Sequence, residues 1–166
     1  MRYRPGKVRD RSDLLRGAAA GLVAGLLASL AMTGFQAGVA KLFPDVSGGG
    51  ESSTEKAADS LSEAAVGEPV PDDKKPAAGE AMQYAFGALL GAGYGIAGER
   101  VEAIKAGGGT IFGAGAALLF DDIVVPALGL SPPASESPPT THVYAIASHL
   151  VFGLVLEGGR RLLRGR

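Results

Sequence analysis

The chain has 166 residues, no cysteine and no tryptophan, and its 16 basic residues almost balance its 17 acidic ones. This length allows one domain, and the lack of cysteine excludes disulfides, thiolate metal sites and cysteine nucleophiles. Mean hydropathy is only +0.20, but charged and apolar residues are strongly segregated along the chain. Uncharged stretches of roughly 20 residues have the length needed to cross a bilayer as helices.

Residues 1–13 form a basic tail, which the positive-inside rule assigns to the cytoplasm. We predict the first transmembrane helix over residues 14–40, because Gly17 to Ala40 contain no acidic or basic side chain. The stretch is too long for the apolar core of a secretory signal peptide. We therefore expect it to be retained as a span.

Residues 41–76 form an acidic connector, expected outside, that is rich in Ser, Gly, Glu, Asp and Pro. Such a composition buries too little apolar surface to become fully ordered. The segment Ser52 to Glu55 nevertheless has the spacing of a capping box, followed by apolar residues at helical intervals. The connector is either a solvated linker or carries one short helix.

The remaining chain alternates spans and short connections. In order, we predict a second span (77–98), a cytoplasmic loop (99–105), a third span (106–129), an external proline-rich loop (130–140), a fourth span (141–158) and a basic cytoplasmic tail (159–166). Arg16 lies at the cytoplasmic start of the first span, and all other basic residues except Lys41, Lys56, Lys74 and Lys75 lie in segments that this topology assigns to the cytoplasm. Both termini are therefore expected on the cytoplasmic side of the cell inner membrane.

Many of the 26 glycines recur at intervals of four residues on the predicted spans. Since lipid provides no hydrophobic drive between helices, association depends on close backbone approach across small residues. The expected packing positions are Gly17, Gly21, Gly25, Gly87, Gly91, Gly95, Gly109, Gly113 and Gly153. The predicted fold is an all-α integral membrane protein, a bundle of four transmembrane helices packed through glycine and small-residue faces.

Two adjacent acids interrupt the third apolar stretch. A carboxylate near a bilayer centre costs roughly 2.5–3.5 kcal/mol on insertion scales, which makes Asp121 and Asp122 functional candidates. Asp121 continues the small-residue row, whereas Asp122 lies about 100° around the helix. If the span instead ends at Phe120, both acids face external water. Pro126 fits either a helix end or a kink.

Two histidines share one face of the fourth span, because His142 and His149 are spaced by whole turns. Gln83 and Thr33 lie on packing faces at a similar depth. These four residues, with Asp121 and Asp122, form the candidate proton or ion site, in which Asp121 and His149 are favoured. His149 is alternatively a packing histidine held by a hydrogen bond.

Several chemistries are disfavoured. His142 and His149 are roughly 10.5 Å apart along one helix, too far to ligate the same ion, and the identity of any metal is left undetermined. No zinc-protease motif, phosphate loop or nucleophile elbow occurs, so neither an enzyme nor a cofactor is expected.

The basic tails lack interleaved aromatics, which disfavours nucleic acid as a partner. The expected partners are the lipid bilayer, further copies of the chain or other membrane proteins.

Residues 84–95, a run of Gly, Ala, Leu and Tyr with one Phe, resemble the second helix of YagU-like inner-membrane proteins. The segments 120–122 and 125–129, followed by His142 and His149, carry the same resemblance, which extends over residues 14–157. It implies a bacterial multi-spanning protein without an established biochemical activity but associated with acid resistance. Residues 41–44 lack the Trp-Glu and Pro-Pro-Arg character expected of the family there.

Two functions remain open from the sequence. The first is proton or ion handling, or an acid-stress response, through an intramembrane Asp/His cluster. The alternative is a structural or assembly subunit that docks other membrane proteins through its glycine faces. Ion flux in liposomes would favour the first function, and co-purification of a stoichiometric partner would favour the second.

Overall fold

The computed structural model describes residues 11–44 and 50–165, and within these ranges the chain forms helices joined by turns, without a strand. Most of the predicted tail 1–13 therefore lies outside the described residues. The elements are α1 (Arg11–Leu42), α2 (Ser53–Val66), η1 (Asp72–Lys74), α3 (Lys75–Gly98), η2 (Glu102–Gly109), α4 (Thr110–Ala116), η3 (Ala117–Val124), α5 (Val125–Ala127), η4 (Ala134–Glu136) and α6 (Pro139–Arg164).

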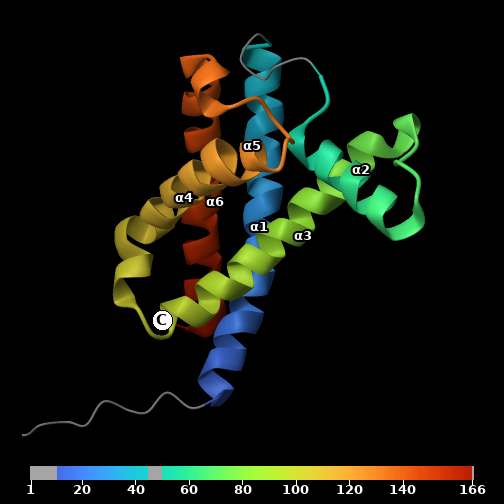
Figure 1. Ribbon diagram of the computed structural model, residues 1–166. Helices are drawn as coiled ribbons and strands as arrows, with labels where there is room; N and C mark the ends of the chain where they lie inside the picture. The colour runs from blue at the N-terminus through green and yellow to red at the C-terminus, as the bar shows by residue number, and fades with distance from the viewer. Residues whose placement is uncertain (1–10, 45–49, 166) are drawn as a thin grey trace, which may run out of the picture.

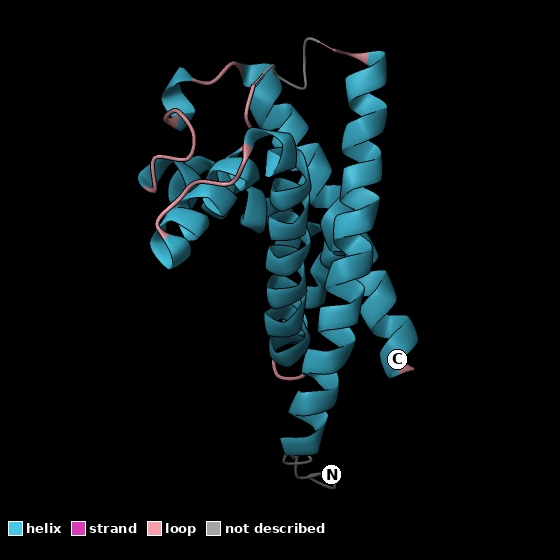
Figure 2. Ribbon diagram, turned by 90° about the vertical axis from the view of Figure 1, so that its right-hand side faces the viewer, coloured by secondary structure: helices cyan, strands magenta, loops and turns pink. Residues whose placement is uncertain are grey.

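The two longest upright helices, α1 and α6, run side by side in opposite directions, and α3 crosses them obliquely (Figure 1). The segment from η2 to α5 packs along α6 and runs towards the end of the molecule at which α6 begins. The start of α1, the end of α3 and the end of α6 all lie at the same end of the molecule, here called the basal end (Figures 1 and 2). The connections before α3 and before α6 lie towards the opposite end.

Three helical segments are long and apolar enough to cross a membrane: Arg11–Leu42, Glu102–Ala127 and Pro139–Arg164. Helix α3, which contains the predicted second span, has 24 residues but is not among them. Its glycines, its two tyrosines and Gln83 lower its mean hydropathy. The described chain is thus all-helical with three candidate spans, and the four-span bundle stays a prediction.

The third predicted span differs from the structure at its start. Residues 102–109 form a short, tight helix that breaks at Ala106, and Gly107, Gly108 and Gly109 all have positive φ. Side chains disfavour this left-handed backbone, whereas glycine adopts it freely. The regular helix therefore begins at Thr110, later than the predicted start at 106.

Glycines bring the backbones of α1 and α3 into direct contact. Gly21 faces the carbonyl oxygen of Gly91, and Gly25 faces that of Gly87, so closely that an added Cβ would overlap the oxygen. One turn further towards the basal end, Gly17 faces the carbonyl oxygen of Gly95 in the same way. The two helices therefore interlock antiparallel, one glycine pair per turn.

The same kind of contact joins α4 to α6. Gly109 and Gly153 each face the other's carbonyl oxygen, and Gly113 faces the carbonyl oxygen of His149. Between the two crossings lies a small core made of residues from α1, α3 and α6: Ala24, Ala28, Tyr94, Phe152 and Leu156. Because alanines line the α1 side of this core, the large rings of α3 and α6 fit beside that helix.

The predicted capping box forms within the connector. Ser52 accepts a hydrogen bond from the Glu55 N–H, and the Glu55 carboxylate accepts one from the Ser52 N–H, which begins α2. The first turn of α2 lies against Gly79 of α3. Part of the connector is therefore an ordered helix rather than a solvated linker.

Lys75, at the start of α3, holds this connector in place through ion pairs. Its Nζ lies 2.8 Å from the Asp59 carboxylate of α2 and 3.0 Å from that of Glu51. The other Asp59 oxygen accepts a hydrogen bond from the Val70 N–H. The hydrogen bond from Lys75 holds the pKa of Asp59 below its ordinary value, and the bonds to Asp59 and Glu51 raise the pKa of Lys75.

Substitution of Gly91 by alanine should destabilise the protein by about 1–3 kcal/mol, because a methyl group there overlaps the backbone of α1. The matched control is Gly93→Ala in the same helix, where an added Cβ has nothing within 4 Å. That variant should be neutral or stabilised, by up to about 1 kcal/mol from helix propensity. Thermal unfolding in detergent, followed by circular dichroism, measures both. Equal tolerance of the two changes would contradict the proposed α1–α3 contact.

Docking of α2 should weaken in acid. Because the pKa of Asp59 is lower folded than unfolded, its ion pair contributes fully above about pH 4, the ordinary value for Asp, and is lost as pH falls through the lowered pKa. Titration of the Asp59 carboxyl carbon by NMR measures that pKa. Lys75→Met should move the pKa upward to the ordinary value, whereas Lys74→Met should leave it unchanged. An unchanged pKa in Lys75→Met would disprove the pairing.

Candidate functional site

The two candidate acids lie on a widened turn of helix. Residues Ala117–Val124 form η3, a π-helical segment between α4 and α5. Such insertions are rare and occur frequently at functional sites. Asp121 and Asp122 are consecutive within η3 and are each partly exposed, so both carboxylates are accessible while still contacting α6.

Asp121 pairs with His149 of α6. The His149 Nδ1 lies 3.3 Å from the Asp121 Oδ2 and 3.0 Å from the carbonyl oxygen of Ala145, one turn earlier. Because both neighbours are acceptors, this geometry fits a proton on Nδ1 that is shared between the carbonyl and the carboxylate. The backbone contact between Gly113 and His149 brings the two helices close enough for the pair to form.

Asp122 pairs with the other histidine. The His142 Nδ1 lies 3.0 Å from the Asp122 Oδ1, and its Nε2 lies 3.0 Å from the carbonyl oxygen of Ala134 in η4. With Asp122 ionised, the ring satisfies both acceptors only when both of its nitrogens carry a proton. With a neutral ring that donates to Ala134, the carboxyl group must hold the second proton. The two contacts can therefore hold a proton between His142 and Asp122.

Gln83 and Thr33 form a third pair, between α3 and α1. The Gln83 Nε2 donates to the Thr33 Oγ1 at 3.0 Å. Within residues 11–44 and 50–165, no hydrogen bond or ion pair joins this pair to either aspartate or either histidine. The six candidate residues are thus three separate pairs rather than one cluster. The same ranges hold no group of three or more His, Asp and Glu side chains arranged to bind a metal ion.

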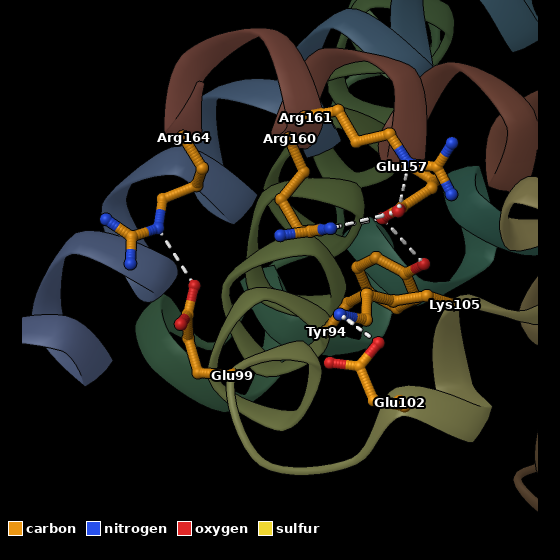
Figure 3. A network of polar contacts seen from close by, with 8 residues as sticks. All are labelled: Tyr94, Glu99, Glu102, Lys105, Glu157, Arg160, Arg161 and Arg164. Atoms are coloured by element: carbon orange, nitrogen blue, oxygen red, sulfur yellow. Dashed lines mark hydrogen bonds and ion pairs between the residues drawn. The ribbon is translucent and has the colours of Figure 1, made fainter. Parts of the chain in front are cut away.

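A second polar site at the basal end was not predicted from the sequence. Its centre is Glu157 of α6, whose side chain is 1% exposed. Its carboxylate accepts hydrogen bonds from the Tyr94 hydroxyl at 3.0 Å, from Nε and Nη2 of Arg160 at 2.6 and 2.9 Å, and from Nε of Arg161 at 2.6 Å (Figure 3). Every lone-pair direction of the buried carboxylate is therefore satisfied.

The network extends to the first and third helices. Arg164, near the end of α6, donates from Nε to the buried Glu99 carboxylate at 2.8 Å and from Nη2 to Asp13 of α1 at 3.4 Å. Figure 3 shows Glu99 and Arg164 beside the Glu157 group at the ends of their helices. The basal network, defined as Asp13, Tyr94, Glu99, Glu157, Arg160, Arg161 and Arg164, thus links α1, α3 and α6.

Sequence reasoning missed this network because residues 159–166 were assigned to a solvent-exposed tail. In the structure α6 continues to Arg164, so the last arginines are helical. The available signal was their spacing: Arg160 and Arg161 follow Glu157 by three and four positions, the separations at which helical side chains meet.

Comparison with models of protein families identifies the family of this chain. The family model described as a protein of unknown function, DUF1440, matches residues 63–158. The chain belongs to this family. Comparison with curated proteins and with solved structures gives no match. The DUF1440 match spans both Asp/His pairs, Tyr94 and Glu157, whereas α1 and Arg160, Arg161 and Arg164 lie outside it.

Glu157→Gln should destabilise the protein by about 3–5 kcal/mol, because it removes the buried carboxylate that accepts hydrogen bonds from both Arg160 and Arg161 and leaves the buried Arg160 guanidinium without that ion pair. The control is Glu63→Gln on the exposed face of α2, which should change stability by less than about 0.5 kcal/mol. Denaturant unfolding in mixed micelles measures both. Equal stabilities would indicate that the basal network contributes nothing to the fold.

Proposed function

We propose that this chain is a four-span inner-membrane protein of the YagU-like type, with both termini in the cytoplasm. The segments with most basic residues adjoin the basal end, which the positive-inside rule assigns to the cytoplasm. Helix α3 supplies the additional span: its 24 residues extend about 36 Å, longer than a hydrocarbon core of about 30 Å. Membership of the DUF1440 family is consistent with this assignment and does not itself specify an activity.

Its function, in this proposal, is to bind protons from the external side as part of an acid response. The observation that carries it is the pairing of two consecutive acids with two different histidines, Asp121 with His149 and Asp122 with His142. Histidine titrates near physiological pH, and a carboxylate in a membrane segment is costly unless it is paired or protonated. Each pair therefore offers a site for a proton, and binding or release of that proton changes the charge of the pair.

The packing supports proton binding rather than an open path across the membrane. Between His149 and Glu157, the inward residues of α6 are Phe152 and Leu156, which are almost fully buried in the core. This apolar layer separates the Asp/His pairs from the basal network. A proton taken up at the pairs would thus alter the contacts of α6 with η3 and η4. No enzymatic step or cofactor is part of the proposal.

A second candidate function is that of an assembly subunit, in a homo-oligomer or with other membrane proteins. Most glycine rows are occupied within the chain, but Gly34 and Gly38 on the external half of α1 have nothing within 4 Å of an added Cβ. A further helix would fit against that face at short range. The two candidates predict different effects of the acid variants.

Asp121→Asn and His149→Ala should each lower acid survival of cells that depend on this protein by about tenfold or more, with the helical circular dichroism retained. The double variant should be no worse than either single one, because the two residues act as one pair. Asp122→Asn should also reduce survival, since its pairing with His142 is at least as close.

Glu63→Gln, an acid variant outside the pairs, serves as the control and should survive as wild type. Proton uptake by the purified protein, measured with a pH-sensitive dye, provides a second readout that does not require the cell. If Asp121→Asn matches wild type in both measurements, the pairs serve only packing and the assembly function is favoured.

A further inference from the structure

A charged cavity opens beside the basal network. Its volume is about 470 Å³, and its lining combines the ends of α3 and α6 with η2: Gly98, Glu99, Glu102, Lys105, Ala106, Glu157, Arg160 and Arg161. Three acidic side chains (Glu99, Glu102 and Glu157) balance three basic ones (Lys105, Arg160 and Arg161) in this lining, and two guanidinium groups share the Glu157 carboxylate.

Arg161 is the most accessible of these cations, with a side chain 55% exposed. It donates to Glu157 through Nε alone, and Figure 3 shows its two terminal nitrogens pointing away from the network. Lys105 also lines the cavity, and its Nζ is 2.8 Å from the largely exposed Glu102 carboxylate. Guanidinium groups bind phosphate oxygens through parallel N–H donors, so these free nitrogens suit an oxyanion.

An apolar groove adjoins the cavity. It has a volume of about 340 Å³ and lies between α3 and the η2–α4 segment, lined by Phe86, Leu89, Leu90, Gly93, Tyr94, Ile104 and Phe112. Leu89, 70% exposed, is among the most exposed apolar residues of α3. From Phe86 to Tyr94 the groove extends about 12 Å along the helix, close to the roughly 15 Å depth of one hydrocarbon leaflet.

The groove and the cavity share a wall. Tyr94 lines the groove with its ring, and its hydroxyl donates to Glu157 in the cavity. Ile104 lines the groove, whereas the next residue, Lys105, lines the cavity. An amphipathic molecule can therefore contact both at once, with its apolar part along α3 and its anionic part at Arg161.

We propose that the groove and the cavity together form a binding site for a phospholipid, with one acyl chain along α3 and the phosphate between Arg161 and Lys105. The site lies at the basal end, where the positive-inside rule puts the cytoplasmic headgroups. Basic pockets between membrane helices on that side bind lipid headgroups. The inference rests on the membrane location of the chain but not on proton binding by the Asp/His pairs.

The test titrates the purified protein in detergent with phosphatidylglycerol and follows thermal unfolding by circular dichroism. Three probes are compared: phosphatidylglycerol, inorganic phosphate alone and a diacylglycerol that lacks phosphate. Only phosphatidylglycerol should raise the unfolding midpoint, by roughly 3 °C or more at saturation.

Two variants address the two halves of the site. Arg161→Gln removes the exposed guanidinium but leaves Arg160 on Glu157, and Gly93→Leu fills the groove at a position where an added Cβ meets nothing within 4 Å. Each should weaken the apparent affinity for phosphatidylglycerol by about tenfold. Their matched controls, Arg100→Gln and Gly115→Leu, change an exposed arginine outside the cavity and an equally open glycine outside the groove, and should bind as wild type.

Three results would overturn the proposal. A full shift with inorganic phosphate that depends on Arg161 but not on Gly93 would identify a free-anion site. An equal rise of the unfolding midpoint with diacylglycerol would show that the phosphate group contributes nothing to binding. The absence of a phosphatidylglycerol shift in the folded wild-type protein would remove the lipid altogether. That result would leave the proton proposal unaffected, because acid survival of Asp121→Asn and His149→Ala tests it separately.

Discussion

The backbones of α1 and α3 approach so closely that carbonyl oxygens of one helix lie where a Cβ of the other would be. This approach constrains the rest of the structure. In lipid, helices associate through packing and hydrogen bonds rather than through a hydrophobic drive, so contact at the closest range contributes most. With α3 held against α1 over three turns, Tyr94 is carried into the core and its hydroxyl reaches Glu157 on α6. The basal network is therefore a consequence of the glycine contact as much as of its own charges.

The second crossing has a comparable consequence at the other end of the bundle. Gly113 contacts the backbone of His149, and the π-helical turn that follows brings two consecutive aspartates towards α6. Two adjacent residues of a regular helix diverge by about 100°, yet Asp121 and Asp122 reach histidines two turns apart. The two pairs thus depend on the glycine row before them and on the local widening of the helix.

Much of the architecture follows from patterns that can be read directly. The glycine intervals identify which faces meet, and the capping box at Ser52 identifies the start of α2. No comparable pattern marks the π-helical turn in the sequence. The basal network could not be predicted for a different reason. In the sequence, Glu157 and the arginines after it resemble the charged flank of a span. Only the tertiary contact with Tyr94 distinguishes a buried network from a solvated tail. Helix α3 is not among the candidate spans, since the glycines that let it pack closely also lower its mean hydropathy.

The ion pair between Arg164 and Asp13 joins positions 151 residues apart in the sequence. Because α6 follows α1 and α3 in the chain, the contacts of Arg164 with Asp13 and with Glu99 cannot form until α6 has been synthesised. The glycine contact between α1 and α3 needs no residue of α6, so these two helices can pair while the rest of the chain is still being made.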